Sequence, residues 1–151
     1  MLSQTAEYAL RIMVHLAEAD GKAMTSEQIA IATRVPTDYA IKILQRLGRD
    51  GYVRSQRGRG GGFVIARDPS RTTLLEIVNI IDPLQRITSC PLGRPEHQHR
   101  LCPLHQRLDN VLKQFEDSLR DTTLEAITTE SVDGTLCSPD QPDLTISAQK
   151  K

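Results

Sequence analysis

The chain has 151 residues, which is enough for one ordinary domain or for one small domain with an arm. Its 19 basic and 19 acidic side chains cancel, which excludes a globally basic nucleic-acid coat protein but leaves room for a local basic patch. Three Tyr, two Phe and no Trp disfavour a large aromatic-rich β-sandwich, and no apolar run approaches the roughly 18 residues that a membrane helix needs.

The first fifty residues predict three helices. Apolar residues at helical spacing indicate the first helix over residues 3–18. Thr25 and Gln28 form a capping box that opens a short second helix. A third helix is predicted to start at Pro36-Thr37-Asp38 and to run to about Arg49, and its apolar positions follow an i, i+3, i+4, i+7 spacing. The predicted core face of this third helix consists of Ala40, Ile43, Leu44 and Leu47.

A β-hairpin and a fourth helix follow. Residues 52–54 and 63–66 predict two short strands on either side of a Gly-rich basic turn at 57–62. Thr73 and Glu76 form a second capping box, and the helix it opens runs to about Ile81.

A long helix dominates the C-terminal part. Residues 84–101 are irregular, and a helix is then predicted from about Pro103 to Ile127, with an apolar stripe several turns long. A lone helix cannot bury such a stripe, whereas a second copy of the chain can. The expected dimerisation residues are Leu104, Leu108, Val111, Phe115 and Leu119.

Four regions result from this pattern. Residues 1–83 form the predicted DNA-binding domain, 84–102 a loop of metal or cluster ligands, 103–130 the dimerisation helix, and 131–151 a disordered tail without periodicity.

The order of the elements indicates a mainly α fold of the winged helix-turn-helix class: three helices, a two-stranded β wing and a long C-terminal helix. Residues 42–67 contain seven basic side chains and one acidic one, a local charge of +6 in a chain of net zero. A solvated helix face and a flexible basic loop would be the structural alternative, but a Gly-rich basic hairpin directly after a basic helix favours DNA binding. The candidate DNA-contacting residues are Thr37, Asp38, Ile41, Lys42, Gln45, Arg46, Arg57, Arg59 and Gly60.

Cysteine and histidine gather before the long helix. They are spaced Cys90-x6-His97-x4-Cys102-x2-His105, a mixture of ligands that suits a metal. With Pro103 as the first helical residue, Cys102 is the expected cap and His105 lies one turn on, so both can face one point. Two Cys and two His can hold tetrahedral zinc or a [2Fe–2S] cluster, and a loop with incidental His is the remaining alternative.

These residues resemble a known family. The run from Glu7-Tyr8-Ala9-Leu10-Arg11 to Arg57-Gly58-Arg59-Gly60-Gly61-Gly62-Phe63 is similar to the Rrf2 family of bacterial regulators that includes IscR, NsrR and CymR, over about residues 1–130. The resemblance implies a homodimeric transcription factor that dimerises through the long helix. It also implies that Arg57 enters a minor groove and that Asp38, Ile41 and Lys42 contact bases.

The resemblance also bears on the metal. Cluster-binding members have three cysteines in this loop, and Cys90 and Cys102 correspond to the first and last of them. Glu96 stands at the middle position, which departs from the pattern, while His105 matches a histidine of the cluster-homeostasis member. Some members add a carboxylate from the first helix of the other protomer, which makes Glu7 of the partner subunit a secondary candidate.

The predicted function is therefore a homodimeric repressor of double-stranded operator DNA that senses redox, iron–sulfur or nitric-oxide status through a [2Fe–2S] cluster. The alternative is a winged-helix repressor with a structural zinc site or no metal. No nucleophile–base pair or HExxH spacing suggests an enzyme. The absence of a signal peptide and an odd number of widely spaced cysteines predict a cytoplasmic protein without membrane partners.

Overall fold

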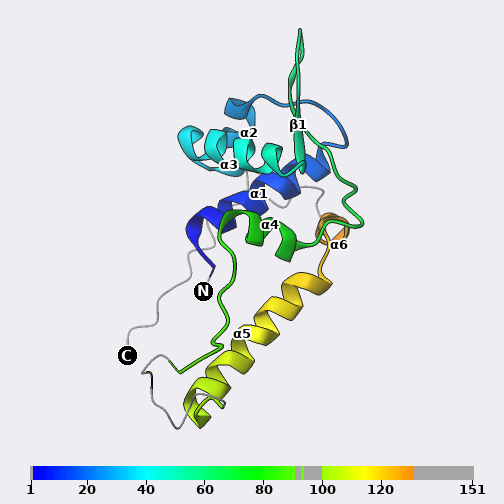
Figure 1. The fold of residues 1–151 in the computed structure, drawn as a ribbon. Helices are drawn as coiled ribbons and strands as arrows, with labels where there is room; N and C mark the ends of the chain where they lie inside the picture. The colour runs from blue at the N-terminus through cyan, green and yellow to red at the C-terminus, as the bar shows by residue number, and fades with distance from the viewer. Residues whose placement is uncertain (1, 91–92, 94–99, 131–151) are drawn as a thin grey trace, which may run out of the picture.

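The computed structural model of the chain describes residues 2–90, 93 and 100–130, and it is mainly helical. Helices α1 to α3 and a β-hairpin form the upper part of the molecule in Figure 1, α4 and α6 lie beneath them, and α5 extends below. The elements are α1 (Gln4–Glu18), α2 (Ser26–Thr33), α3 (Thr37–Arg49), β1 (Val53–Gln56), β2 (Gly62–Ile65), α4 (Leu74–Ile81), α5 (Pro103–Asp121) and α6 (Leu124–Glu130). The predicted fold class is confirmed.

Helix α1 lies at the centre of the core. It contacts α2, α3, α4, α6 and β2, and Ala9, Ile12 and Met13 are completely buried in these contacts. Ser3 caps α1 by accepting a hydrogen bond from the Ala6 N–H at 3.2 Å. Both predicted capping boxes, at the starts of α2 and α4, are present. Each capping box involves two residues only three positions apart, so the local sequence alone determines where α2 and α4 begin.

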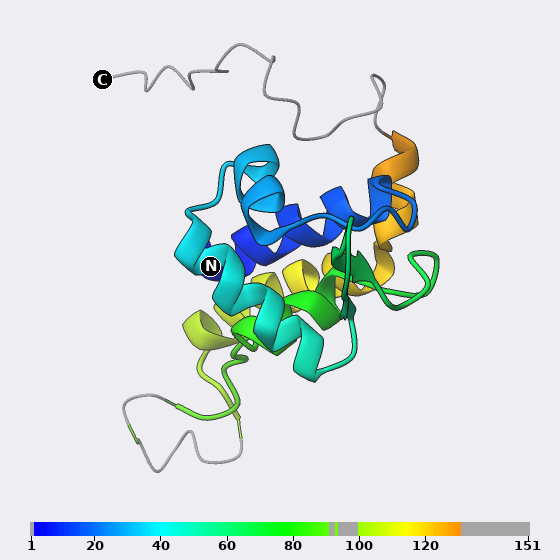
Figure 2. The ribbon, with the colours of Figure 1, turned by 90° about the horizontal axis from the view of Figure 1, so that it is seen from above.

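Helix α3 follows α2 after a tight turn. Arg34 ends α2 in the left-handed conformation, with φ of 53°, and the Val35 N–H donates to the Ala30 carbonyl. The predicted core face of α3 is confirmed, since its four apolar residues are all buried: Ala40, Ile43, Leu44 and Leu47. The turn sets α3 across the top of α1 (Figures 1 and 2), and the polar residues of α3 are exposed.

The hairpin is antiparallel, and its register pairs Val53 with Ile65 and Gln56 with Gly62. Both strands are displaced by one or two residues from their predicted ranges. A bridge between Met24 and Phe63 attaches the hairpin to the segment before α2. Gly62 has φ of 152°, and a Cβ there would lie 2.3 Å from the Met24 carbonyl oxygen. This contact explains why the position requires glycine.

The prediction of one unbroken helix after Pro103 is wrong. Helix α5 ends at Asp121, and Thr122 is extended with φ of −105° and ψ of 122°. Its carbonyl accepts a hydrogen bond from the Leu74 N–H, while the Leu124 N–H donates to the Thr72 carbonyl. Leu124 is completely buried and begins α6, which packs on α1. The break places α6 in the core and lets α5 leave it.

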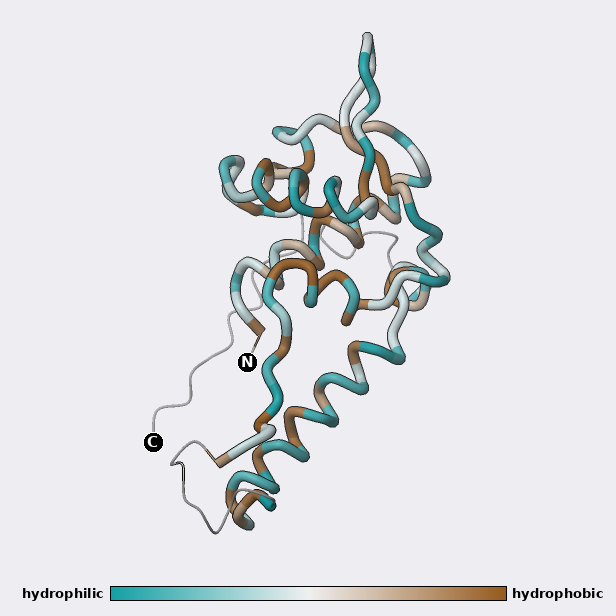
Figure 3. Tube along the Cα trace, viewed as in Figure 1, coloured by the Kyte–Doolittle hydropathy of each residue, from teal (hydrophilic) through white to brown (hydrophobic). Residues whose placement is uncertain are grey.

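Helix α5 alternates apolar and polar positions along its length (Figure 3). Leu104, Leu108, Val111 and Phe115 are exposed, whereas Leu119 packs against the core. No helix among the described residues is long and apolar enough to cross a membrane. The predicted tail at 131–151 and the candidate ligand His97 lie outside the described residues.

Candidate nucleic-acid interface and metal centre

The outward face of α3 is polar and exposed. Asp38, Lys42, Gln45 and Arg46 lie on the side of the helix opposite its buried residues, and Ile41 among them is 36% exposed. Thr37, which starts the helix, is exposed as well. Amide and charged groups on one helix face can form hydrogen bonds with base edges and phosphates, and a methyl group such as that of Ile41 can contact thymine.

The tip of the hairpin is narrow and basic. Arg57 and Arg59 are exposed there, and the Gly61 N–H donates to the Gly58 carbonyl at 2.9 Å to close the turn. Gly60 has φ of 78° in open space. The hairpin projects from the same end of the molecule as α3 (Figure 1). This arrangement brings the predicted helix and wing residues to one surface.

One of the seven cations in residues 42–67 has a structural role. The Arg67 guanidinium carbon lies 4.1 Å from the centroid of the Tyr52 ring, and its Nη2 donates to the Asp50 carbonyl at 3.2 Å. Burial, reinforced by the charge of Glu76, raises the pKa of the Tyr52 hydroxyl. Arg67 therefore fastens the base of the hairpin.

Aromatic side chains support α3 at its other end. The Tyr8 and Tyr39 rings meet edge to face with centroids 6.1 Å apart. The Lys42 Nζ lies 6.0 Å from the Tyr39 ring, and the Arg11 guanidinium lies 5.7 Å from the Tyr8 ring. These contacts join the first turns of α1 and α3 and help to place Lys42.

The expected geometry at the start of α5 is present. Cys102 is the N-cap and Pro103 is the first helical residue. Cys102 Sγ lies 3.3 Å from His105 Nδ1. Two ligands of one tetrahedral zinc ion, at about 2.3 Å for sulfur and about 2.0 Å for nitrogen, stand about 3.6 Å apart. The pair thus fits two coordination positions of one metal centre.

The other candidate ligands are not brought together by the described residues. Cys90 is partly buried and its carbonyl accepts from the Gly93 N–H at 3.0 Å. Within residues 2–90, 93 and 100–130, no group of three His, Cys, Asp or Glu side chains converges as a metal site. Glu7 forms an ion pair with Arg11 at 2.6 Å within its own helix.

An ion pair that the sequence analysis missed joins the ligand segment, the candidate ligand loop at residues 84–102, to α5. Arg86 donates from Nε and Nη2 to the two carboxylate oxygens of Asp109, at 2.7 and 2.6 Å. The Ile87 N–H also donates to Asp109, and Arg86 contacts Glu116 at 3.3 Å. The hydrogen bonds from Arg86 lower the pKa of the Asp109 carboxyl. Because Arg86 and Asp109 are 23 residues apart in the sequence, no local spacing pattern predicts their ion pair.

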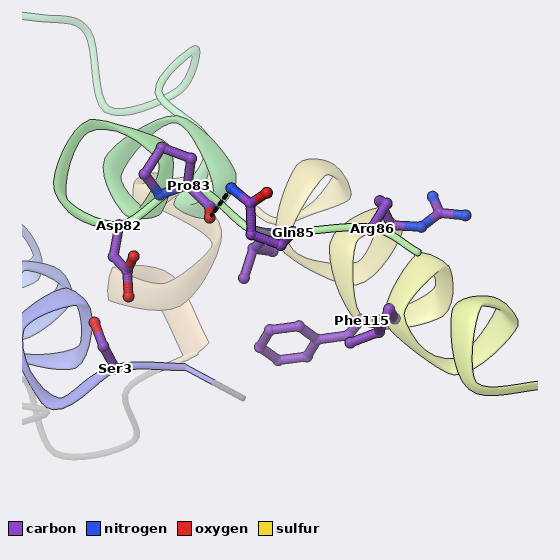
Figure 4. A pocket seen from close by; sticks show the side chains of 8 residues that line it. Ser3, Asp82, Pro83, Gln85, Arg86 and Phe115 are labelled. Atoms are coloured by element: carbon purple, nitrogen blue, oxygen red, sulfur yellow. Dashed lines mark hydrogen bonds between the residues drawn. The ribbon is translucent and has the colours of Figure 1, made fainter. Parts of the chain in front are cut away.

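A small cavity lies beside this ion pair. It has a volume of about 170 Å³ and is lined by Ser3 before α1, by residues 82–86 after α4, and by Leu112 and Phe115 of α5. Figure 4 shows the Phe115 ring pointing into the space next to Ser3 and Asp82, while the Arg86 guanidinium points away from it. The cavity marks where α5 separates from the rest of the molecule.

Comparisons with known proteins agree with this architecture. Residues 2–130 match the model of the family Rrf2, described as an iron-dependent transcriptional regulator. The regulator NsrR of Bacillus subtilis is 33% identical over 90 residues, which span 59% of this chain and 62% of NsrR.

Two solved structures share the fold. CymR, the global cysteine regulator of B. subtilis, superimposes with a TM-score of 0.72 at 22% identity and covers 87% of this chain and 98% of its own. IscR of T. potens gives a TM-score of 0.69 at 20% identity, covering 86% of this chain and 87% of its own.

Proposed function

The chain belongs to the Rrf2 family of transcriptional regulators. We propose that it is a homodimeric repressor whose affinity for operator DNA depends on a metal centre. It is a DNA-binding regulator and not an enzyme. The observation that carries the proposal is the surface shared by α3 and the hairpin, where exposed polar and basic groups meet. Its place of action is the cytoplasm, where operator DNA is accessible.

Helix α3 enters the major groove. Asp38, Ile41 and Lys42 contact base edges from its first turns, while Thr37, Gln45 and Arg46 contact bases or phosphates at its flanks. The exposure of all six side chains, and the rigid attachment of α3 through its buried face, support this assignment.

The wing enters the adjacent minor groove. Arg57 and Arg59 carry its positive charge, and Gly60 lets the backbone come close to the sugar–phosphate strand. A minor groove about 6 Å wide accommodates a thin hairpin tip, and a narrow A·T groove attracts arginine most strongly.

A second copy covers the exposed apolar side of α5. Leu104, Leu108 and Val111 are 62%, 47% and 63% exposed, which is unusual for large aliphatic residues in a row on one helix. Pairing through this stripe, continued by Phe115 and bordered by Leu119, gives a dimer with two α3 helices. Such a dimer binds two half-sites about 34 Å apart, or a multiple of that distance.

Cys90, His97, Cys102 and His105 would hold the metal centre, with Glu7 of the partner subunit as a secondary ligand. The short distance from Cys102 to His105 supports the second half of this set. An iron–sulfur cluster, favoured as [2Fe–2S], would supply sensitivity to oxidants or nitric oxide. Because the Arg86–Asp109 ion pair links the same segment to α5, a change in the ligand loop reaches the dimerisation helix.

A second function is a repressor with a structural zinc ion at this position. The separation of Cys102 Sγ and His105 Nδ1 suits zinc as well as iron. In that case the metal stabilises the start of α5, and DNA binding responds to another signal or to none.

The test begins with selection of bound fragments from genomic DNA by the purified full-length protein. We expect a palindromic site, and we expect the double variant Arg57→Ala, Arg59→Ala to lose binding to it in gel-shift titrations. Arg71→Ala serves as the control, because Arg71 is an exposed arginine outside α3 and the hairpin. Equal binding by the double variant and the wild type would refute the proposed surface.

A further inference from the structure

A groove runs between α3 and the base of the hairpin. Its volume is about 480 Å³. One wall belongs to the last turns of α3 and the other to β1, whose residues after Val53 are exposed. The lining residues are Leu44, Gln45, Gly48, Arg49, Val53, Arg54, Ser55 and Phe63.

Two cations stand on opposite walls of this groove. Arg49 ends α3 and Arg54 lies near the start of β1, and both are exposed. Among the described residues neither forms an ion pair, in contrast to Arg86 and Arg120 of the ligand segment and α5. Gly48 also lines the groove, and a Cβ there would lie 3.8 Å from the Val53 side chain and carbonyl, so the helix backbone comes close to β1 at this point.

In the proposed binding mode, on which this inference rests, a DNA strand lies in the groove. A helix in the major groove and a wing in the neighbouring minor groove stand on either side of one sugar–phosphate strand. That strand has to pass between α3 and the hairpin, where the groove lies. We propose that Arg49 and Arg54 bind this strand by contacting its phosphates from both sides.

The chemistry of the groove suits a phosphodiester strand. Guanidinium groups pair with phosphate through charge-assisted hydrogen bonds, and Gln45 and Ser55 add polar groups at the rim. The partly exposed Phe63 offers an apolar surface to the deoxyribose, and Leu44 and Val53 are buried beneath the groove. Contacts of this kind fix register and affinity without discriminating between bases.

Arg49 and Arg54 differ in role from the neighbouring cations. Arg57 and Arg59 at the tip are assigned to the minor groove. Arg67 stacks on the Tyr52 ring and donates a hydrogen bond to the Asp50 carbonyl. Arg49 and Arg54 are instead placed to neutralise phosphate charge for any DNA sequence.

The experiment measures the salt dependence of DNA binding. For Arg49→Gln and Arg54→Gln, we expect the slope of log K against log salt to fall by about one unit each, with the ratio of operator to random-DNA affinity unchanged. Arg71→Gln, which removes an exposed arginine outside the groove, should leave the slope unaltered. An unchanged slope in both groove variants, or an altered base preference, would overturn the assignment.

Single methylphosphonate substitutions along the operator locate the contact. Neutralising the phosphate between the helix and wing contacts should weaken wild-type binding at least threefold and should have no further effect on Arg54→Gln. If this phosphate affects wild type and variant equally, the inference fails while the proposed function stands. If wild-type protein binds no DNA, the proposed function itself fails. Circular dichroism of each variant confirms that it is folded.

Discussion

Arg86 and Asp109 form a bidentate ion pair that connects the segment after α4 to α5. The carboxylate accepts from Nε and Nη2 of Arg86 at 2.7 and 2.6 Å, and from the Ile87 N–H at 3.0 Å. Asp109 is only 8% exposed. The ion pair lies between the DNA-binding helices and the predicted dimer interface, so it fixes the direction in which α5 leaves the core.

Removal of this carboxylate should release the segment. In Asp109→Ala the Ile87 amide loses its acceptor, and its hydrogen exchange should become at least tenfold faster while amides in α1 keep their protection. Asp117→Ala is the matched control, since Asp117 also pairs with cations on α5 but accepts no bond from residues 84–90. Equal protection of Ile87 in wild type and Asp109→Ala would contradict the role given to the pair.

The same pair predicts a pH dependence. Arg86 lowers the pKa of the Asp109 carboxyl in the folded state. The ion pair therefore stabilises the fold fully at pH values above the unfolded-state pKa of Asp, about 3.9. The effect is lost as the pH falls through the lower folded-state pKa. We expect the free energy of unfolding to decrease more steeply below about pH 4 in wild type than in Asp109→Asn. Urea titrations at pH 7, 4 and 3 measure the difference, and parallel curves would exclude it.

The apolar stripe of α5 predicts the oligomeric state. Wild-type protein should sediment as a dimer at micromolar concentration, and Leu108→Asp should give monomers because it places an unpaired charge in the interface. Leu108 is 47% exposed in the single chain, so the helix itself should survive the substitution. Asn110→Asp, on another face of α5, should remain dimeric. A monomeric wild type would reject the interface.

Gly62 should be essential to the hairpin. A Cβ there would lie 2.3 Å from the Met24 carbonyl oxygen, so Gly62→Ala has to move the wing away from the segment before α2. We expect a loss of about 1–3 kcal/mol in the free energy of unfolding. Gly60→Asn should cost much less, because φ there is 78° in open space and Asn tolerates this conformation. Chemical denaturation of both variants makes the comparison.

The parts of the fold that the sequence predicted correctly depend on neighbouring residues. The core face of α3, the two capping boxes and the approach of Cys102 to His105 all follow from spacings of three or four residues within one helix. In these cases local geometry alone determines which side chains meet.

The features that were missed depend on residues far apart in the chain. The break after Asp121 arises because residues 122–124 form backbone hydrogen bonds with residues 72–74, and an apolar stripe gives no sign of such a pairing. Thr123, whose hydroxyl accepts from the Ala126 N–H, is a local cap signal for the start of α6. The Arg86–Asp109 pair had no local signal at all.

The contact between Cys102 and His105 at the start of α5 predicts a bound metal. Protein purified and reconstituted anaerobically with iron and sulfide should bind iron and sulfide in stoichiometric amounts and absorb visible light. Cys90→Ala and Cys102→Ala should each abolish the bound iron, and His105→Ala should reduce it, because the 3.3 Å between Cys102 Sγ and His105 Nδ1 would let both bind one metal ion. Cys137→Ala, in the C-terminal region outside the proposed ligand set, is the control and should bind as much iron as wild type.

Elemental analysis decides between the two metals. Stoichiometric zinc with little iron would reject the cluster and favour the structural zinc site, in which case DNA affinity should not respond to oxidant. If His105→Ala retains all its iron while Cys102→Ala loses it, the 3.3 Å contact between Cys102 Sγ and His105 Nδ1 is a hydrogen bond to a ligand rather than shared coordination. The absorption spectrum of His105→Cys separates these cases further, since a thiolate in place of imidazole alters the cluster's charge-transfer bands only when position 105 coordinates the metal.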